Sequence, residues 1–180
     1  MTVTAGVPDL VASSTAALAA EQWRVAGALS AVSSRGAWRA RLSPDARWQL
    51  VRVGHFPAYA AELDWTPREI AGHLRDSARV FTERIRRLCA EDEPRVADFV
   101  TDSPERVADY RATPPDVLLD QLRTAQAELL QAVAGVGVGE LSRRGVHEVD
   151  GPFTLADVLR FLPDHQRDHA EQLRALLPRR

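Results

Sequence analysis

The sequence predicts an all-α protein: a four-helix bundle built as a single domain over residues 1–180. Helix starts are marked by Ser-Pro and Thr-Pro pairs, and apolar residues recur every three or four positions between these starts. No segment alternates apolar and polar residues for long enough to predict a sheet. Four of the predicted helices are long and amphipathic, as the helices of a bundle are.

The helix starts have a physical basis. A Ser or Thr oxygen caps a free backbone N–H, and the proline that follows already has the backbone angle of a first helical residue. Thr66 is followed by Glu69, which completes a capping box, and Thr154 with Asp157 is a weaker version of the same signal. The Ser/Thr-Pro pairs are Ser43-Pro44, Thr66-Pro67, Ser103-Pro104 and Thr113-Pro114.

The spacing of the apolar residues predicts where each helix begins and ends, and two features interrupt this spacing. Pro163 lies inside the last helix, where it removes a backbone hydrogen bond and predicts a kink. The connection Glu91–Pro115, between the second and third long helices, has the length of a lid or binding loop, and its Phe99 and Tyr110 could line a pocket. Long helices are predicted over Pro8–Val32, Pro67–Ala90, Pro114–Ala134 and Thr154–Leu177, and short helices over Pro44–Val53 and Pro104–Tyr110.

Composition narrows the class of protein. The formal net charge of −2 gives no reason to expect nucleic acid or an anionic membrane as partner. No apolar run approaches the ~20 residues that span a bilayer, and the N-terminus does not read as a secretory signal. The single cysteine, Cys89, fits a reducing cytoplasm and a packed thiol rather than a reactive nucleophile. We therefore expect a cytoplasmic protein that acts on a small molecule, with a homodimer as the candidate assembly.

Three of the five histidines fall on inward stripes of predicted helices. His165 and His169 are four residues apart, so both rings lie on one helix face and can reach one metal ion. His73 lies on the inward stripe of another helix and could supply a third ligand. Unpaired buried imidazoles are costly, which favours metal binding at these inward positions. The alternative is that the three histidines are hydrogen-bonded separately in a polar core.

Several segments resemble the DinB-like (YfiT-like) superfamily of metal-binding four-helix bundles. The family pattern is a Trp-Ser/Thr-Pro helix start followed by His-Leu-x-Asp, then a terminal His-x-x-x-His. The resemblance covers about residues 10–177 and implies one divalent metal ion, zinc, nickel or iron, bound by His73, His165 and His169. The matching segments are Trp65–Asp76, Gly145–His147, Gly151–Leu159 and His165–His169.

Three neutral imidazoles leave at least one coordination position open, where a thiol or a water molecule can lose its proton. The resemblance implies a thiol S-transferase or thiol-dependent isomerase that uses a low-molecular-weight thiol. All 23 basic residues are arginine, which indicates a GC-rich genome and makes mycothiol the leading cosubstrate. The alternatives are a metal-dependent hydrolase or iron oxidase on the same site, and a metal-binding stress protein without turnover. An arginine-lined groove would favour the thiol, and a site with no access path would favour the last alternative.

The other conspicuous residues receive smaller roles. His147, shortly before the last helix, is a candidate catalytic proton donor, and the alternative is a histidine in a surface loop. Asp76 and Asp168 could orient an imidazole N–H, although solvated helix carboxylates are the alternative. His55 has no expected catalytic role. The four tryptophans are expected to be packing residues: Trp23, Trp38, Trp48 and Trp65.

Overall fold

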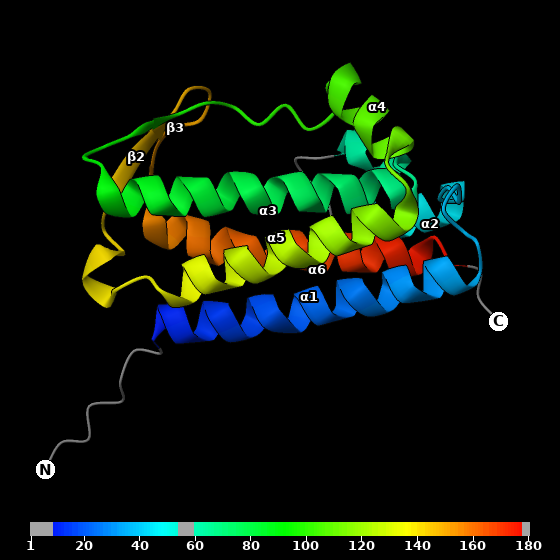
Figure 1. The fold of residues 1–180 in the computed structure, drawn as a ribbon, viewed down its shortest axis with the longest axis horizontal. Helices are drawn as coiled ribbons and strands as arrows, with labels where there is room; N and C mark the ends of the chain where they lie inside the picture. The colour runs from blue at the N-terminus through cyan, green and yellow to red at the C-terminus, as the bar shows by residue number, and fades with distance from the viewer. Residues whose placement is uncertain (1–8, 54–59, 178–180) are drawn as a thin grey trace, which may run out of the picture.

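Four long helices lie side by side in the computed structural model, which describes residues 9–53 and 60–177 (Figure 1). α3 packs along α5, and α1 packs along α6. This arrangement confirms the predicted four-helix bundle. The long helices are α1 (Leu10–Ser34), α3 (Pro67–Ala90), α5 (Pro115–Ala134) and α6 (Leu155–Ala175).

The predicted caps are present at four of the five helix starts. The side chains of Ser43, Thr66, Ser103 and Thr154 each accept a hydrogen bond from a backbone N–H in the first turn of their helix. The start predicted at Thr113-Pro114 is wrong by one residue: Pro114 is the capping residue of α5, and Thr113 instead closes the preceding helix. Two adjacent prolines made the first helical position ambiguous, because either one fits it.

Shorter elements connect the long helices. The connection between α3 and α5 passes over α3 and carries α4 at the other end of that helix (Figure 1). Pro163 lies inside α6, which continues past it, and the kink expected there stays a prediction. The short elements are α2 (Pro44–Arg52), η1 (Ala60–Asp64), β1 (Arg95–Val96), α4 (Pro104–Ala112), η2 (Val138–Glu140), β2 (Arg144–His147) and β3 (Gly151–Thr154).

The expectation that the chain forms no sheet is wrong. β1, β2 and β3 form a small three-stranded sheet, in which β1 and β2 are parallel and β2 and β3 are antiparallel. His147 pairs with Val96 on one side and with Gly151 on the other. The strands have two to four residues, which is too short for a period-two pattern to be visible in the sequence. The sheet holds His147 in a fixed backbone position.

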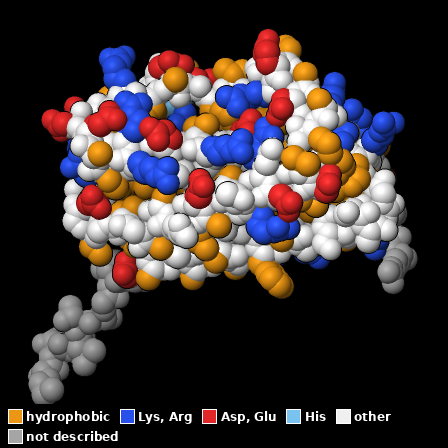
Figure 2. Space-filling model, viewed as in Figure 1, with side chains coloured by type: hydrophobic (Ala, Val, Ile, Leu, Met, Phe, Trp, Pro, Cys, Tyr) orange, Lys and Arg blue, Asp and Glu red, His pale blue; other side chains and the backbone are white. Residues whose placement is uncertain are grey.

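The core contains two large apolar clusters along the bundle and a small third cluster around Leu50 and Leu63. On α6, one large cluster ends at Leu162 and the other begins at Ala170, so that His165 and His169 lie between them. On the face shown in Figure 2, acidic and basic side chains are interspersed. Of the helices that the structure describes, none combines the length and apolar character that crossing a bilayer requires.

The sequence predicts that all four tryptophans are packing residues, and the structure contradicts this for two of them. Trp65 is buried and Trp38 packs partly against the core. Trp23 and Trp48 are instead 81% and 61% exposed. The packing prediction therefore fails for these two, which lie on the outer sides of α1 and α2.

The close contact between α3 and α4 yields a stability prediction. A methyl group added in Gly72→Ala would lie 2.2 Å from Cδ1 of Tyr110. The Tyr110 ring cannot easily move away, because it is fully buried and its hydroxyl donates a hydrogen bond to Asp76. We expect a free energy of unfolding lower by about 1–3 kcal/mol, measured by urea denaturation. Gly27→Ala on α1 is the matched control, because its new methyl would meet no atom within 4 Å. The control should be neutral or stabilising by up to about 1 kcal/mol; equal losses in both variants would contradict the packing.

Candidate metal centre

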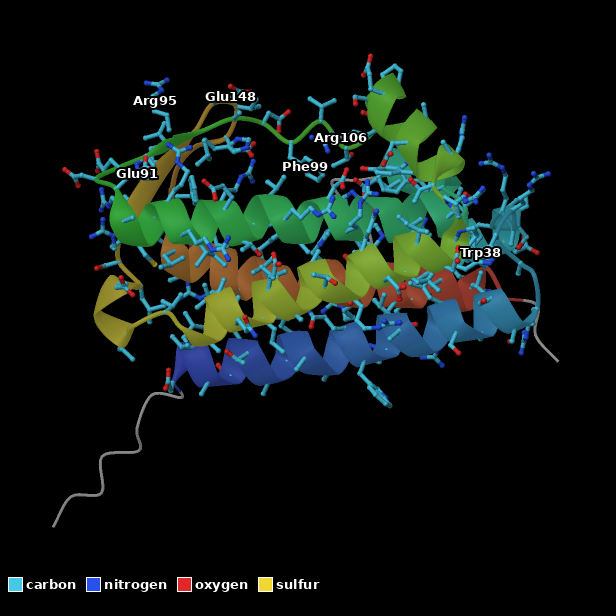
Figure 3. The ribbon with its side chains drawn as sticks, viewed as in Figure 1. Trp38, Glu91, Arg95, Phe99, Arg106 and Glu148 are labelled. Atoms are coloured by element: carbon cyan, nitrogen blue, oxygen red, sulfur yellow. The ribbon has the colours of Figure 1, made fainter. Side chains whose placement is uncertain are left out.

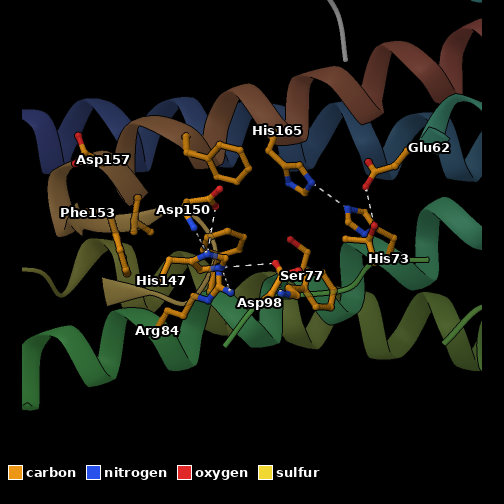
Figure 4. Close-up of a pocket in the computed structure, with 15 residues that line it drawn as sticks. Glu62, His73, Ser77, Arg84, Asp98, His147, Asp150, Phe153, Asp157 and His165 are labelled. Atoms are coloured by element: carbon orange, nitrogen blue, oxygen red, sulfur yellow. Dashed lines mark hydrogen bonds and ion pairs between the residues drawn. The ribbon is translucent and has the colours of Figure 1, made fainter. Parts of the chain in front are cut away.

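The three histidines predicted to share a site lie together in the structure. His73 comes from α3, and His165 and His169 come from successive turns of α6. All three side chains are buried, and one ring nitrogen from each lies within 4.8 Å of the other two. The Nε2 atoms of His73 and His165 are 2.9 Å apart (Figure 4). The bundle therefore brings together residues 92 positions apart in the chain.

The cluster has the chemical properties of a metal site. Burial, followed by the neighbouring His169 and His165 rings, lowers the pKa of His73 well below its ordinary value. Burial and His169 lower the pKa of His165 in the same way. Both rings are therefore neutral at pH 7, which is the form that binds metal ions. Two nitrogens bound at about 2.0–2.1 Å to one tetrahedral ion are about 3.4 Å apart. The observed separation of 2.9 Å is within about 0.5 Å of this value, so a small outward shift of the rings would let them share an ion.

The alternative of separately hydrogen-bonded histidines accounts for part of the cluster, because His73 and His165 are within hydrogen-bond distance of one another and His169 is within that distance of Gln172. The Nδ1 atoms of His73 and His165 are buried, and neither has a hydrogen-bond partner among the described residues. A polar core built from these rings would need such partners, because an unmade hydrogen bond in a buried position is costly. Three imidazoles that converge on one point are better explained by a common ligand.

His169 is oriented by a residue that the sequence did not reveal. Its Nδ1 lies 3.0 Å from Oε1 of Gln172, which can only accept, so the Nδ1–H donates and the Nε2 lone pair faces the cluster. Gln172 in turn donates from Nε2 to the backbone carbonyl of Glu62, at 2.6 Å. Metal-binding histidines are commonly held in this way through their second nitrogen. The only signal in the sequence was position: Gln172 lies one turn after His169.

Glu62 is the second site residue that the sequence did not reveal. It belongs to η1, directly before the Trp-Thr-Pro start of α3, and its side chain is 5% exposed. Its Oε2 lies 3.4 Å from Nε2 of His169, and its Oε1 accepts a hydrogen bond from Thr101. Nothing in the residue pattern around Glu62 indicates that the chain turns it inward.

Aromatic rings enclose the histidines on several sides. Trp65 stacks on His169 with 6.3 Å between ring centroids and lies 4.9 Å from His73. Phe161 stacks on His165 at 5.3 Å. Phe99, in the connection after β1, stacks on His73 at 5.9 Å, and Figure 3 shows it pointing towards α3. This apolar surrounding limits the contact of the rings with water and strengthens electrostatic interactions at the site.

A cavity of about 300 Å³ reaches the cluster from the side of the sheet (Figure 4). His73 and His165 line it at one end, whereas His169 lies behind them, fully buried. Phenylalanine side chains form its apolar walls and His147 lies at its other end. The predicted binding role of the long connection stays a prediction, but three of its residues do line the cavity: Asp98, Phe99 and Thr101.

His147 is a buried residue of β2 and not part of a surface loop. Its Nδ1 accepts hydrogen bonds from the backbone N–H groups of Asp150 and Val149. Its Nε2 lies 3.2 Å from a guanidinium nitrogen of Arg84, and it faces Asp98 at 3.7 Å. His147 therefore shares the cavity with two of the clustered histidines but is not a member of the cluster.

The other residues that the sequence singled out do not belong to the histidine cluster. Asp76 is buried and pairs with Arg75 and Arg106, so it orients α4 on α3 and is not a solvated carboxylate. Asp168 pairs with Arg167. Burial raises the pKa of the Cys89 thiol, as expected for a packed cysteine. Tyr110 is a core residue and lines no part of the cavity, and His55 lies outside the described residues.

Comparisons with known proteins agree with this architecture. A model of the DinB superfamily matches residues 9–173. Among solved structures, YfiT from Bacillus subtilis is similar, with 15% identity and a TM-score of 0.69 over 98% of this chain and 90% of YfiT. YfiT is described as a probable metal-dependent hydrolase with an unusual four-helix bundle topology; at this identity the likeness shows the fold alone. No curated protein matches the sequence at a significant level.

Proposed function

The chain belongs to the DinB superfamily, and from this premise we propose that it is a metal-dependent enzyme that presents a low-molecular-weight thiol, as thiolate, to a small electrophilic substrate. The observation that carries the proposal is the cavity that ends on two histidines of a three-histidine cluster. An S-transferase and a thiol-dependent isomerase both fit this description. We propose His73, His165 and His169 as the ligands of one divalent ion, with zinc, nickel and iron as the candidates.

The chain's own residues prepare the site in three ways. The buried, neutral rings of His73 and His165 offer lone pairs without first losing a proton. Gln172 fixes the orientation of His169. The surrounding aromatic rings limit the access of water to the side of the cavity. A divalent ion bound there supplies Lewis acidity, which lowers the pKa of a bound thiol or water.

Access to the cluster favours catalysis over metal storage. A metal-binding protein without turnover needs no cavity beside its ligands, whereas an enzyme must admit a cosubstrate to the open position. The cavity has a volume at the lower end of the range for small-molecule sites. We propose His147, at the far end of this cavity, as a group that contacts the substrate or transfers a proton.

The charges around the cavity bear on which thiol is used. The arginine-lined groove that would have favoured the thiol transferase is absent from the described part of the chain, because Arg84 is the one arginine of the lining. Carboxylates repel anions and accept hydrogen bonds from hydroxyl groups. A neutral, hydroxyl-rich thiol of the mycothiol type therefore fits better than a thiol that carries carboxylates. The carboxylates of the lining are Glu62, Asp98, Asp150 and Asp157.

A metal-dependent hydrolase is the second candidate. The observation in its favour is the buried Glu62 carboxylate beside His169, which could hold a water molecule at the open position. The description of YfiT points in the same direction, although it applies to that protein.

Cobalt substitution tests the thiol proposal directly. Adding mycothiol to the cobalt-loaded protein should produce a strong charge-transfer band in the near ultraviolet, because sulfur then binds the metal. Metal-free protein should give no band and no conjugation of thiol to a model electrophile. If no thiol changes the cobalt spectrum, although water there exchanges, the transferase proposal fails and the hydrolase becomes the better candidate.

A further inference from the structure

Glu62 is a buried carboxylate, and one of its oxygens makes no hydrogen bond with the described residues. Its Oε1 accepts a hydrogen bond from Thr101 at 3.0 Å. Its Oε2 is buried and has no hydrogen-bond partner among the described residues, although the residue is one of those that line the cavity. A buried carboxylate oxygen without a donor is costly. This oxygen lies 3.4 Å from Nε2 of His169, so a ligand that binds beside the histidine cluster and carries a proton donor can supply the missing hydrogen bond.

The position of Glu62 is fixed by the same residues that form the metal site. Gln172 holds the backbone carbonyl of Glu62 with one end of its amide and orients His169 with the other. Thr101, from the connection after β1, holds the second carboxylate oxygen. Movement of Glu62 away from the cluster would break its hydrogen bonds with Gln172 and Thr101. These two hydrogen bonds therefore hold the carboxylate beside the histidines.

Glu62 lies beside the cluster and not within it. Its Oε2 is 3.4 Å from Nε2 of His169, but within residues 9–53 and 60–177 the set of ligand atoms close enough to hold one ion comprises the three histidines. A carboxylate in this place is suited to contact whatever occupies the open coordination position. Three neutral imidazoles do not reduce the charge of a divalent ion, so the carboxylate of Glu62 places one negative charge beside the full 2+ charge.

We propose that Glu62 selects the ligand at the open position: it hydrogen-bonds a ligand that carries a proton donor and disfavours a small anion. This role rests on the metal site of the proposed function but not on the identity of the thiol. The class of ligand it selects carries an O–H or N–H group next to the atom that meets the metal, as a hydroxyl-rich thiol does when its sulfur is bound as thiolate.

Anion binding to the cobalt-loaded full-length protein tests this role. Thiocyanate is titrated into wild type and Glu62→Gln, and its dissociation constant is read from the visible spectrum of the cobalt ion. We expect Glu62→Gln to bind thiocyanate about tenfold more tightly or better, because it removes a nearby negative charge at nearly constant shape. Glu128→Gln is the control, since it removes the same charge from an exposed position on α5. It should leave the constant unchanged.

Every result of the thiocyanate titration either supports or overturns the proposed role of Glu62. Tighter thiocyanate binding in Glu62→Gln alone, with cobalt content and thermal stability retained, supports the role. Equal constants in wild type, Glu62→Gln and Glu128→Gln would overturn it while leaving the thiol proposal intact. Loss of cobalt from Glu62→Gln would make Glu62 a ligand and overturn it as well. A wild-type protein that binds no cobalt would overturn the metal site itself, and this inference with it.

Discussion

Replacing His165 and His169 together with alanine should abolish metal binding. The two rings lie on successive turns of α6 and supply two of the three clustered nitrogens, so the remaining His73 is a single ligand. One imidazole in a buried apolar pocket does not hold a divalent ion against water. We expect the metal content to fall from about one ion per chain to background, measured by elemental analysis after exhaustive loading and desalting.

The matched control for this variant is His147→Ala. His147 is also a buried histidine and lines the same cavity, but it lies outside the cluster. Its replacement should leave the metal content unchanged. Full metal content in the His165→Ala/His169→Ala variant, or an equal loss in His147→Ala, would contradict the assignment of the ligands.

His73→Ala should weaken metal affinity by about a thousandfold, because it removes one of three ligands. His73 is distant in sequence, so this variant tests whether the bundle closes the site as the structure shows. The measurement is competition with a chelator of known affinity, on protein whose folding has been checked by circular dichroism. Unchanged affinity together with a lower melting temperature would instead mean that His73 serves only to pack the core.

Much of the fold was predictable, because helix caps and apolar stripes are local signals. The Ser and Thr caps before Pro44, Pro67 and Pro104 appear where the sequence indicates them. The small sheet was not predictable, since its strands are too short to show a pattern and depend on pairing between segments about 50 residues apart. His147 owes its buried position to that sheet, which is why the sequence left a surface loop open as an alternative.

The site was predictable only in part, for a related reason. A histidine on an apolar stripe stands out, and the i, i+4 spacing of His165 and His169 links two of them. Glu62 and Gln172 are ordinary charged and polar residues in sequence. They become site residues because η1 turns Glu62 inward and because the Gln172 amide bridges Glu62 and His169. Such contacts depend on tertiary packing, which residue spacing alone does not report.

The metal content of the protein as purified tests the central claim most directly. The chain should be expressed without an affinity tag, because a histidine tag would itself bind metal, and analysed for transition metals by mass spectrometry against protein concentration. The three converging imidazoles predict about one divalent ion per chain, retained through gel filtration. Protein that carries no metal above background, and takes up none when incubated with zinc, nickel, iron or cobalt, would contradict the account.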